Sequence, residues 1–193
     1  MKIFYVCSYG GCGSTMLCKY LNNFGKSFHV HDRNPPDKLT QLGLLCYHEW
    51  FNGIPIHECE LMNYHVIFIY RNPVHCIYSR FQLPEHLYHI KCNTTIKIAD
   101  VIRERKDLYG INQFFNKYTI PNPKRNYRVH CIKYEELFDK MSEFNKHFDL
   151  PDRPELYPIE QVSNRECGEK TILVEIYKDL LEKMNAKKFI EVV

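Results

Sequence analysis

Residues 1–24 read MKIFYVCSYGGCGSTMLCKYLNNF, and this stretch passes from an apolar run through a glycine-rich turn to a helical pattern. Residues 2–8 are almost all apolar, aromatic or β-branched, which is typical of a central parallel strand covered on both faces. Gly10, Gly11 and Gly13 then permit positive φ values and let successive N–H groups converge on an anion. The stretch therefore predicts a strand, an anion-binding turn and a helix, in that order.

The helix that follows is expected to complete the anion site. Ser14 and Thr15 open it, and apolar residues recur at helical spacing as far as Phe24. Its first N–H groups lack intrahelical acceptors and carry the positive end of the helix dipole, so they point back toward the turn. Ser14 follows Gly13 directly, without the lysine of a Walker A loop. This spacing disfavours an ordinary nucleoside triphosphatase or nucleoside kinase of that type.

Composition bounds the class of protein. With 193 residues and 45% hydrophobic content, the chain suits one domain, residues 1–193. A net charge of +3 is too modest to imply a nucleic-acid partner. No apolar run is long enough to span a membrane and no signal pattern opens the sequence, so we expect a soluble, cytoplasmic protein. Nine cysteines without a C-x-x-C pair are expected to be reduced, space-filling thiols.

Strand and helix patterns alternate along the chain. Further strands are expected at residues 27–31, 54–57, 66–70 and 127–133. Helices are expected at residues 37–51, 74–81, 95–105, 108–117, 134–148 and 170–187, whereas the pattern lapses at 82–93. The alternation predicts an α/β fold with a parallel sheet of four or five strands, helices on both faces and a ligand at the carboxyl ends of the strands.

A second motif, VIFIYRNP, occupies residues 66–73. Arg71 ends its strand, and Ser79 follows eight positions later on the next predicted helix. The planar guanidinium of Arg71 suits a phosphate dianion, and Ser79 adds a hydroxyl donor. Together with the glycine-rich turn, this motif resembles the sulfotransferase family, which has a P-loop-like fold. The resemblance implies that Arg71 and Ser79 bind the 3′-phosphate of the donor 3′-phosphoadenosine 5′-phosphosulfate (PAPS).

The resemblance also implies a full donor site and an activity. A third segment, KYEEL at residues 133–137, looks like the family segment whose tyrosine lies by the adenine. The donor-binding residues implied are Gly10, Gly11, Cys12, Gly13, Ser14, Thr15, Arg71, Ser79 and Tyr134. The implied reaction moves a sulfuryl group from PAPS to a hydroxyl or amine, leaves 3′-phosphoadenosine 5′-phosphate (PAP) and needs no metal. The acceptor class stays open among small molecules, glycans, lipids and peptides.

His57 is the expected catalytic base. It ends a predicted strand and is what this chain retains, as Pro-Ile-His, of the family's Lys-Thr-His segment. A neutral imidazole can accept a hydroxyl proton near neutral pH. His31, Asp32 and Glu49 remain alternatives, and other branches of the family use a carboxylate. His86 and His89 are assigned instead to a loop on the acceptor side.

The chain departs from the family where the phosphosulfate loop carries a lysine or arginine, because Gly11 stands there. Losing such a preorganised donor can cost roughly 3–4 kcal/mol of transition-state stabilisation. Either another cation, such as Lys19 or Arg33, replaces it, or activity is weak. The family's C-terminal Arg-Lys-Gly clamp is matched only poorly, at residues 164–168. The alternatives from other classes are a kinase-like phosphotransferase and a non-catalytic nucleotide-binding module.

Overall fold

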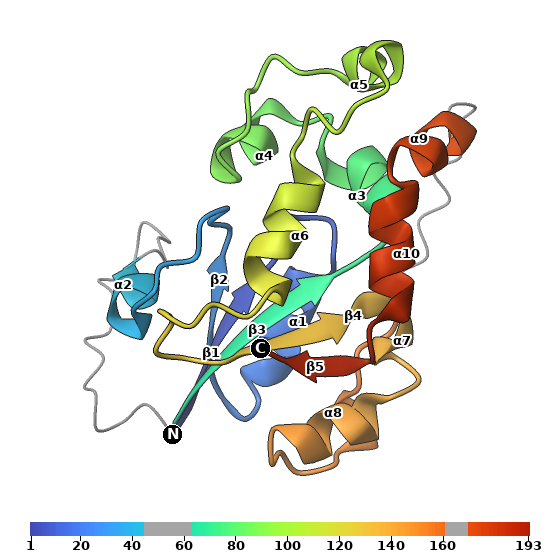
Figure 1. Cartoon of the computed structure of the whole chain (residues 1–193). Helices are drawn as coiled ribbons and strands as arrows, with labels where there is room; N and C mark the ends of the chain where they lie inside the picture. Colours follow the sequence, from blue (N-terminus) through green and yellow to red (C-terminus); the bar gives the residue numbers. More distant parts are fainter. Residues whose placement is uncertain (45–62, 161–169) are drawn as a thin grey trace.

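The computed structural model describes residues 1–44, 63–160 and 170–193. Within these ranges five strands form one sheet in the order β2-β1-β3-β4-β5 (Figure 1). The strands are β1 (Lys2–Cys7), β2 (Gly25–Val30), β3 (Tyr64–Tyr70), β4 (Val129–Lys133) and β5 (Ile190–Val192). The helices are α1 (Ser14–Leu21), α2 (Leu39–Leu44), α3 (Pro73–Arg80), α4 (Pro84–His89), α5 (Ile98–Glu104), α6 (Ile111–Thr119), α7 (Tyr134–Leu137), α8 (Met141–His147), the 3-10 turn η2 (Pro154–Leu156), α9 (Lys170–Ile176) and α10 (Lys178–Ala186). The predicted α/β class is confirmed, and none of these described helices is both long enough and apolar enough to cross a membrane.

The strand order brings two loops to one edge of the sheet. β1 pairs in parallel with both β2 and β3, and β3 pairs in parallel with β4. The chain therefore leaves β1 toward one side of the sheet and later returns on the other side, which makes the gap between β1 and β3 a topological switch point. The loops after β1 and β3 meet there, and they hold residues 10–13, just before α1, and Arg71.

One strand breaks the predicted all-parallel pattern. β5 runs antiparallel to β4, with Ile132 opposite Ile190, and it extends the sheet past the last predicted strand. The single helix expected at residues 170–187 is also wrong, because Tyr177 separates α9 from α10. The break between the two helices coincides with a tertiary contact, because the buried Tyr177 hydroxyl donates to Asp107 at 2.7 Å. A strand of three residues is too short to give a period-2 signal in the sequence.

Other helix boundaries also differ from those predicted from the sequence. The helix expected at residues 134–148 is two helices, α7 and α8, and residues 82–93, where the pattern lapses, contain α4. α4 begins at Pro84, whose fixed φ suits the first position of a helix. The strand expected at residues 54–57 and the second half of the helix expected at 37–51 lie outside the described residues.

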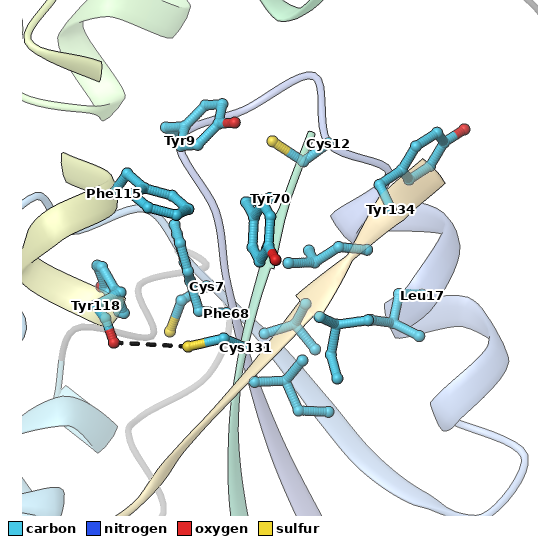
Figure 2. Packing of buried hydrophobic residues seen from close by; sticks show 14 of the residues in the cluster. Cys7, Tyr9, Cys12, Leu17, Phe68, Tyr70, Phe115, Tyr118, Cys131 and Tyr134 are labelled. Carbon is cyan, nitrogen blue, oxygen red and sulfur yellow. Dashed lines mark hydrogen bonds between the residues drawn. The ribbon is translucent and has the colours of Figure 1, made fainter. Parts of the chain in front are cut away.

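Helices cover both faces of the sheet, as the apolar strand sequences predict. On one face, the ring of Phe68 in β3 stacks on Tyr118 of α6, with centroids 4.6 Å apart (Figure 2). On the other face, Phe4 of β1 packs edge-on against Phe148, which follows α8, and Leu17 of α1 is fully buried. The two central strands consequently have apolar residues on both sides.

Three histidines from β3, β4 and α8 lie close together. His65 of β3 stacks on Phe4, and Nδ1 of His130 in β4 lies 2.8 Å from Nε2 of His147. Burial is the main cause that lowers the pKa of His65 from 6.5 to about 4, and Lys2 adds to it. Burial, with His147 next, lowers the pKa of His130 to about 4. Both imidazoles are therefore neutral in the folded protein at neutral pH.

Acid should destabilise the protein through these side chains. Between pH 6.5 and 4 the unfolded chain binds protons on His65 and His130 that the folded chain does not, so the free energy of unfolding falls as the pH falls. Each kcal/mol lost lowers Tm by about 2–4 °C in a chain of this size. A His65→Phe variant keeps an aromatic ring on Phe4 without titrating, so its Tm should fall less over that range. Equal slopes for the variant and the wild type, measured by circular dichroism, would contradict this assignment.

Candidate functional site

The glycine turn, defined as residues 10–15, has the backbone of an anion cradle. Gly10, Gly11 and Gly13 have φ values of 93°, 70° and 78°, which residues with a side chain rarely adopt. The Gly13 carbonyl accepts the first hydrogen bond of α1, from the Leu17 N–H at 2.9 Å. In the part of the chain that the structure describes, the N–H groups of residues 11–16 have no acceptor. Successive unpaired donors at a helix start form a nest for an anion.

Tyr9 fastens the glycine turn to the end of β3. Its side chain is fully buried, and its hydroxyl donates to the Arg71 carbonyl and accepts the Arg71 N–H at 3.1 Å. Burial raises the pKa of Tyr9 well above its usual value, so the hydroxyl keeps its proton and can make both bonds. The turn and Arg71, which are separated by 62 positions in the sequence, are thereby held at the same edge of the sheet.

A third segment joins them there. The guanidinium carbon of Arg71 lies 4.3 Å from the centroid of the Tyr134 ring, within cation–π range. A Cβ added to Gly13 would lie only 2.5 Å from Cε2 of Tyr134, so the turn packs directly on that ring. The Asn72 N–H donates to Oε1 of Glu135 at 2.7 Å, which ties the motif after β3 to the motif after β4. The three motifs identified in the sequence therefore form one constellation.

The remaining predicted donor residues have different surroundings. Ser14 is buried, and its hydroxyl lies 3.0 Å from the Ser8 hydroxyl, which also accepts the Gly10 N–H at 3.3 Å. Thr15 is exposed at the start of α1, and Ser79 lies in the last turn of α3 and is partly exposed. Cys12 is fully buried, which leaves only its backbone N–H for the nest. His57 and Glu49 lie outside the described residues.

The position that carries a cation in the resembling family has no room for one here. A Cβ on Gly11 would lie 3.0 Å from Cα of Cys76, so the backbone of the turn packs against α3. Neither suggested replacement fits the role. Arg33 donates to the carbonyls of Ile90, Tyr109 and Gly110 at 3.2, 2.7 and 3.2 Å. Lys19 is exposed in the last turn of α1, at the far end from the glycine turn.

Two histidines hold the backbone just before the turn. Nδ1 of His31 lies 3.1 Å from the Ser8 carbonyl, and Nε2 of His86 lies 3.1 Å from the Tyr9 carbonyl. A carbonyl only accepts, so these nitrogens carry the protons, and the other nitrogen of each neutral ring keeps its lone pair. Burial is the main cause that lowers the pKa of each histidine to about 4, so both rings are neutral at pH 7.

Two of the candidate bases, Asp32 and His31, lie within the described residues and differ in their hydrogen-bond partners. Asp32 is buried, forms an ion pair with Lys91 at 2.5 Å and accepts the Asn34 N–H at 2.7 Å. Its carboxylate is therefore occupied on both oxygens. His31 has an unprotonated nitrogen, Nε2, on a ring whose Nδ1 contacts the residue two positions before the turn, which makes it the better of the two.

Tyr9 was missed as a site residue by the sequence reasoning, and His86, which was assigned to a loop on the acceptor side, lies in α4 and contacts the Tyr9 carbonyl. The ring of His86 fills the space that a side chain on Gly10 would need, with Cε1 2.0 Å from the position of a Cβ. No periodic signal marks the tyrosine before a glycine-rich turn as an anchor for another strand. The glycines themselves were the available clue, since each one marks a close approach by another segment.

A comparison of the chain with protein-family models, curated proteins and solved structures found no match. Among the described residues, no group of three or more histidine, cysteine or acidic side chains is arranged to hold a metal ion. The geometry and the chemistry of the residues are therefore the basis for a functional proposal.

The contact between Gly13 and Tyr134 can be tested by a double-mutant cycle. Gly13→Ala should destabilise the protein by about 1–2 kcal/mol through its left-handed backbone, and further through the clash with the ring. In a Tyr134→Ala background the clash is gone, so the cost should fall by roughly 1 kcal/mol, as contacting pairs show. Urea denaturation measures both costs.

Gly110→Ala is the matched control, because Gly110 also has a positive φ, 64°, but meets Arg33 rather than Tyr134. Its cost should be the same in both backgrounds. If the cost of Gly13→Ala did not change with Tyr134→Ala either, the packing of the turn on that ring would be refuted.

Proposed function

We propose that this protein is a PAPS-dependent sulfotransferase that binds its donor at the sheet edge where the loops after β1 and β3 meet. The observation that carries the proposal is the meeting of two anion-binding elements at one sheet edge. The unpaired N–H groups of the glycine turn provide one, and the Arg71 guanidinium provides the other. The Tyr134 ring contacts both. A nucleotide with phosphates at both ends of its ribose suits such an arrangement.

In this proposal the donor's two phosphates go to different elements. The 5′-phosphosulfate binds the N–H groups of the glycine turn and the start of α1. The 3′-phosphate binds the guanidinium of Arg71, with a hydroxyl from Ser79, and the adenine lies by Tyr134. The Tyr9 hydroxyl supports this division, because it fixes the backbone of Arg71 relative to the turn.

The proposed chemistry is an in-line transfer. An acceptor oxygen or nitrogen forms a bond to sulfur while the bond between sulfur and the 5′-phosphate oxygen breaks. The acceptor's proton passes to a histidine base, and the leaving phosphate keeps the electron pair, stabilised by the N–H groups of the turn. Fixed positions of donor and acceptor supply the larger part of the rate.

Two histidines are candidates for the base. His57, the base that the resemblance implies, stays a prediction because it lies outside the described residues. His31 is supported by its position next to the turn and by its tautomer, which leaves Nε2 unprotonated. A pKa of about 4 keeps His31 fully neutral at pH 7, but it also makes the imidazole a weak base. An acidic acceptor hydroxyl, such as that of a phenol, would suit it best.

A specific observation favours the non-catalytic alternative, a nucleotide-binding module. Gly11 packs on Cys76 where the resembling family has a cation, so the leaving phosphate would have only backbone donors on that side. Binding and transfer must accordingly be tested separately.

Binding should depend on Arg71. Arg71→Ala removes a charge-assisted hydrogen bond of about 1.5–3 kcal/mol, so the affinity for PAP should fall roughly 10- to 100-fold in isothermal titration calorimetry. Arg103→Ala is the matched control, since Arg103 is exposed on α5 and pairs with Asp100. Equal losses of PAP affinity for both variants would indicate a general effect of removing one positive charge rather than a binding site. No loss for Arg71→Ala would contradict the proposed donor orientation.

The pH dependence of transfer should identify the base. The acidic limb of kcat/KM reports the pKa of the base in the free enzyme. With His31 as base, the limb should lie near pH 4, because burial lowers its pKa to about 4. An unperturbed His57 would place it near 6.5. The measurement uses radiolabelled PAPS with an acceptor panel, over the pH range where circular dichroism shows the protein folded.

Variants then separate the two bases. His31→Gln should abolish transfer if His31 is the base, whereas undiminished transfer by this variant together with loss in His57→Ala would assign the role to His57. A wild type that binds PAP but transfers sulfate to no acceptor would support the non-catalytic module instead.

A further inference from the structure

Two buried thiols join the glycine turn to α3. Sγ of Cys12, in the turn, lies 3.7 Å from Sγ of Cys76, in the second turn of α3, and both side chains are fully buried. This distance is van der Waals contact between sulfurs. The two residues are separated by 64 positions, so the contact depends on the tertiary structure alone.

The backbones around the two cysteines are already close. A Cβ on Gly11 would lie 3.0 Å from Cα and 3.2 Å from Cβ of Cys76. A disulfide has its sulfurs about 2.0 Å apart, so closing the gap moves them together by roughly 1.7 Å. Gly11 and Gly13 flank Cys12, and their wide range of φ and ψ lets Cys12 move without displacing β1 or α1.

We propose that Cys12 and Cys76 are a redox modification site, at which a peroxide forms a reversible disulfide that weakens anion binding by the glycine turn. The effect on binding rests on the proposed function, whereas formation of the disulfide does not. Drawing Cys12 toward α3 takes its N–H out of the nest of donors that the turn offers.

The chemistry balances with one peroxide. The Cys12 sulfur attacks a peroxide oxygen, so an S–O bond forms, the O–O bond breaks, and the released hydroxide takes a proton to become water. The Cys76 sulfur then attacks the Cys12 sulfur, the S–S bond forms, and the S–O oxygen leaves as a second water. Two thiols are oxidised and one peroxide is reduced to two waters.

Position decides the order of these steps. Cys12 lies in the turn itself, with Sγ 3.3 Å from the Gly10 carbonyl, so a movement of the turn exposes it before Cys76, which lies within α3. Burial raises the pKa of the Cys76 thiol well above its usual value, which disfavours Cys76 as the first of the two to react with peroxide. Because both sulfurs are buried, oxidation requires the turn to open, and a ligand held by the turn should slow it.

The first arm of the test maps the disulfide in the full-length wild type. Reduced protein is exposed to graded hydrogen peroxide, its remaining thiols are alkylated, and its peptides are analysed by mass spectrometry without reduction. We expect a linked pair of peptides containing Cys12 and Cys76 that dithiothreitol separates. If both cysteines stay alkylated while other cysteines oxidise, or if their oxidation runs to sulfonic acid without a link, the proposal is overturned.

The second arm measures PAP affinity before and after peroxide. Loss of one charge-assisted N–H bond predicts an affinity about tenfold weaker after oxidation, restored by dithiothreitol. Cys76→Ser should bind PAP as the wild type does and should not respond to peroxide. Cys131→Ser is the matched control and should respond fully, because its sulfur lies 3.7 Å from the Tyr118 carbonyl rather than near Cys12.

The two arms separate the possible failures. If the reduced wild type does not bind PAP, the proposed function fails, and the peptide map still decides whether the disulfide forms. If the disulfide forms and PAP affinity does not change, the regulatory part of the proposal is overturned.

Discussion

The candidate site depends on the hydroxyl of Tyr9. It is buried, it donates to the Arg71 carbonyl, and it accepts the Arg71 N–H, so a single side chain satisfies both polar groups of one residue at the end of β3. Leaving those groups unpaired inside the protein would cost about 1–3 kcal/mol each. This bond fixes the backbone of the arginine relative to the glycine turn. The Tyr134 ring then packs between the Arg71 guanidinium and Gly13.

The turn is shaped by what surrounds it as much as by its own glycines. His86 fills the space beside Gly10, Cys76 lies against Gly11, and Tyr134 lies against Gly13. Each neighbour excludes a side chain at one glycine, so at these three positions the turn presents only backbone groups. This arrangement favours binding of an anion over stabilisation of a strongly charged leaving group, for which a cation is more effective. The same packing brings the sulfur of Cys12 within 3.7 Å of that of Cys76.

Sequence patterns predicted the elements of this protein that neighbouring residues in the sequence determine. The apolar run at β1, the glycines after it and the strand that ends in Arg71 were identified because periodicity and positive φ leave marks on neighbouring residues. Their meeting at one sheet edge followed from the rule that loops after parallel strands converge. β5 and the break at Tyr177 were missed, since both are fixed by distant partners, β4 and Asp107. The carbonyl groups to which Arg33 donates could not be predicted either, because no local sequence pattern indicates which distant backbone a side chain will contact.

The most direct test compares two ligands on the unmodified protein. PAP and adenosine 5′-monophosphate share the adenine, the ribose and the 5′-phosphate, and they differ by the 3′-phosphate that the account assigns to Arg71. Isothermal titration calorimetry should show PAP binding roughly 10- to 100-fold more tightly, as a charge-assisted contact to one phosphate predicts. Equal affinity for the two nucleotides, or binding of neither, would contradict the claim that this site recognises a 3′-phosphorylated nucleotide.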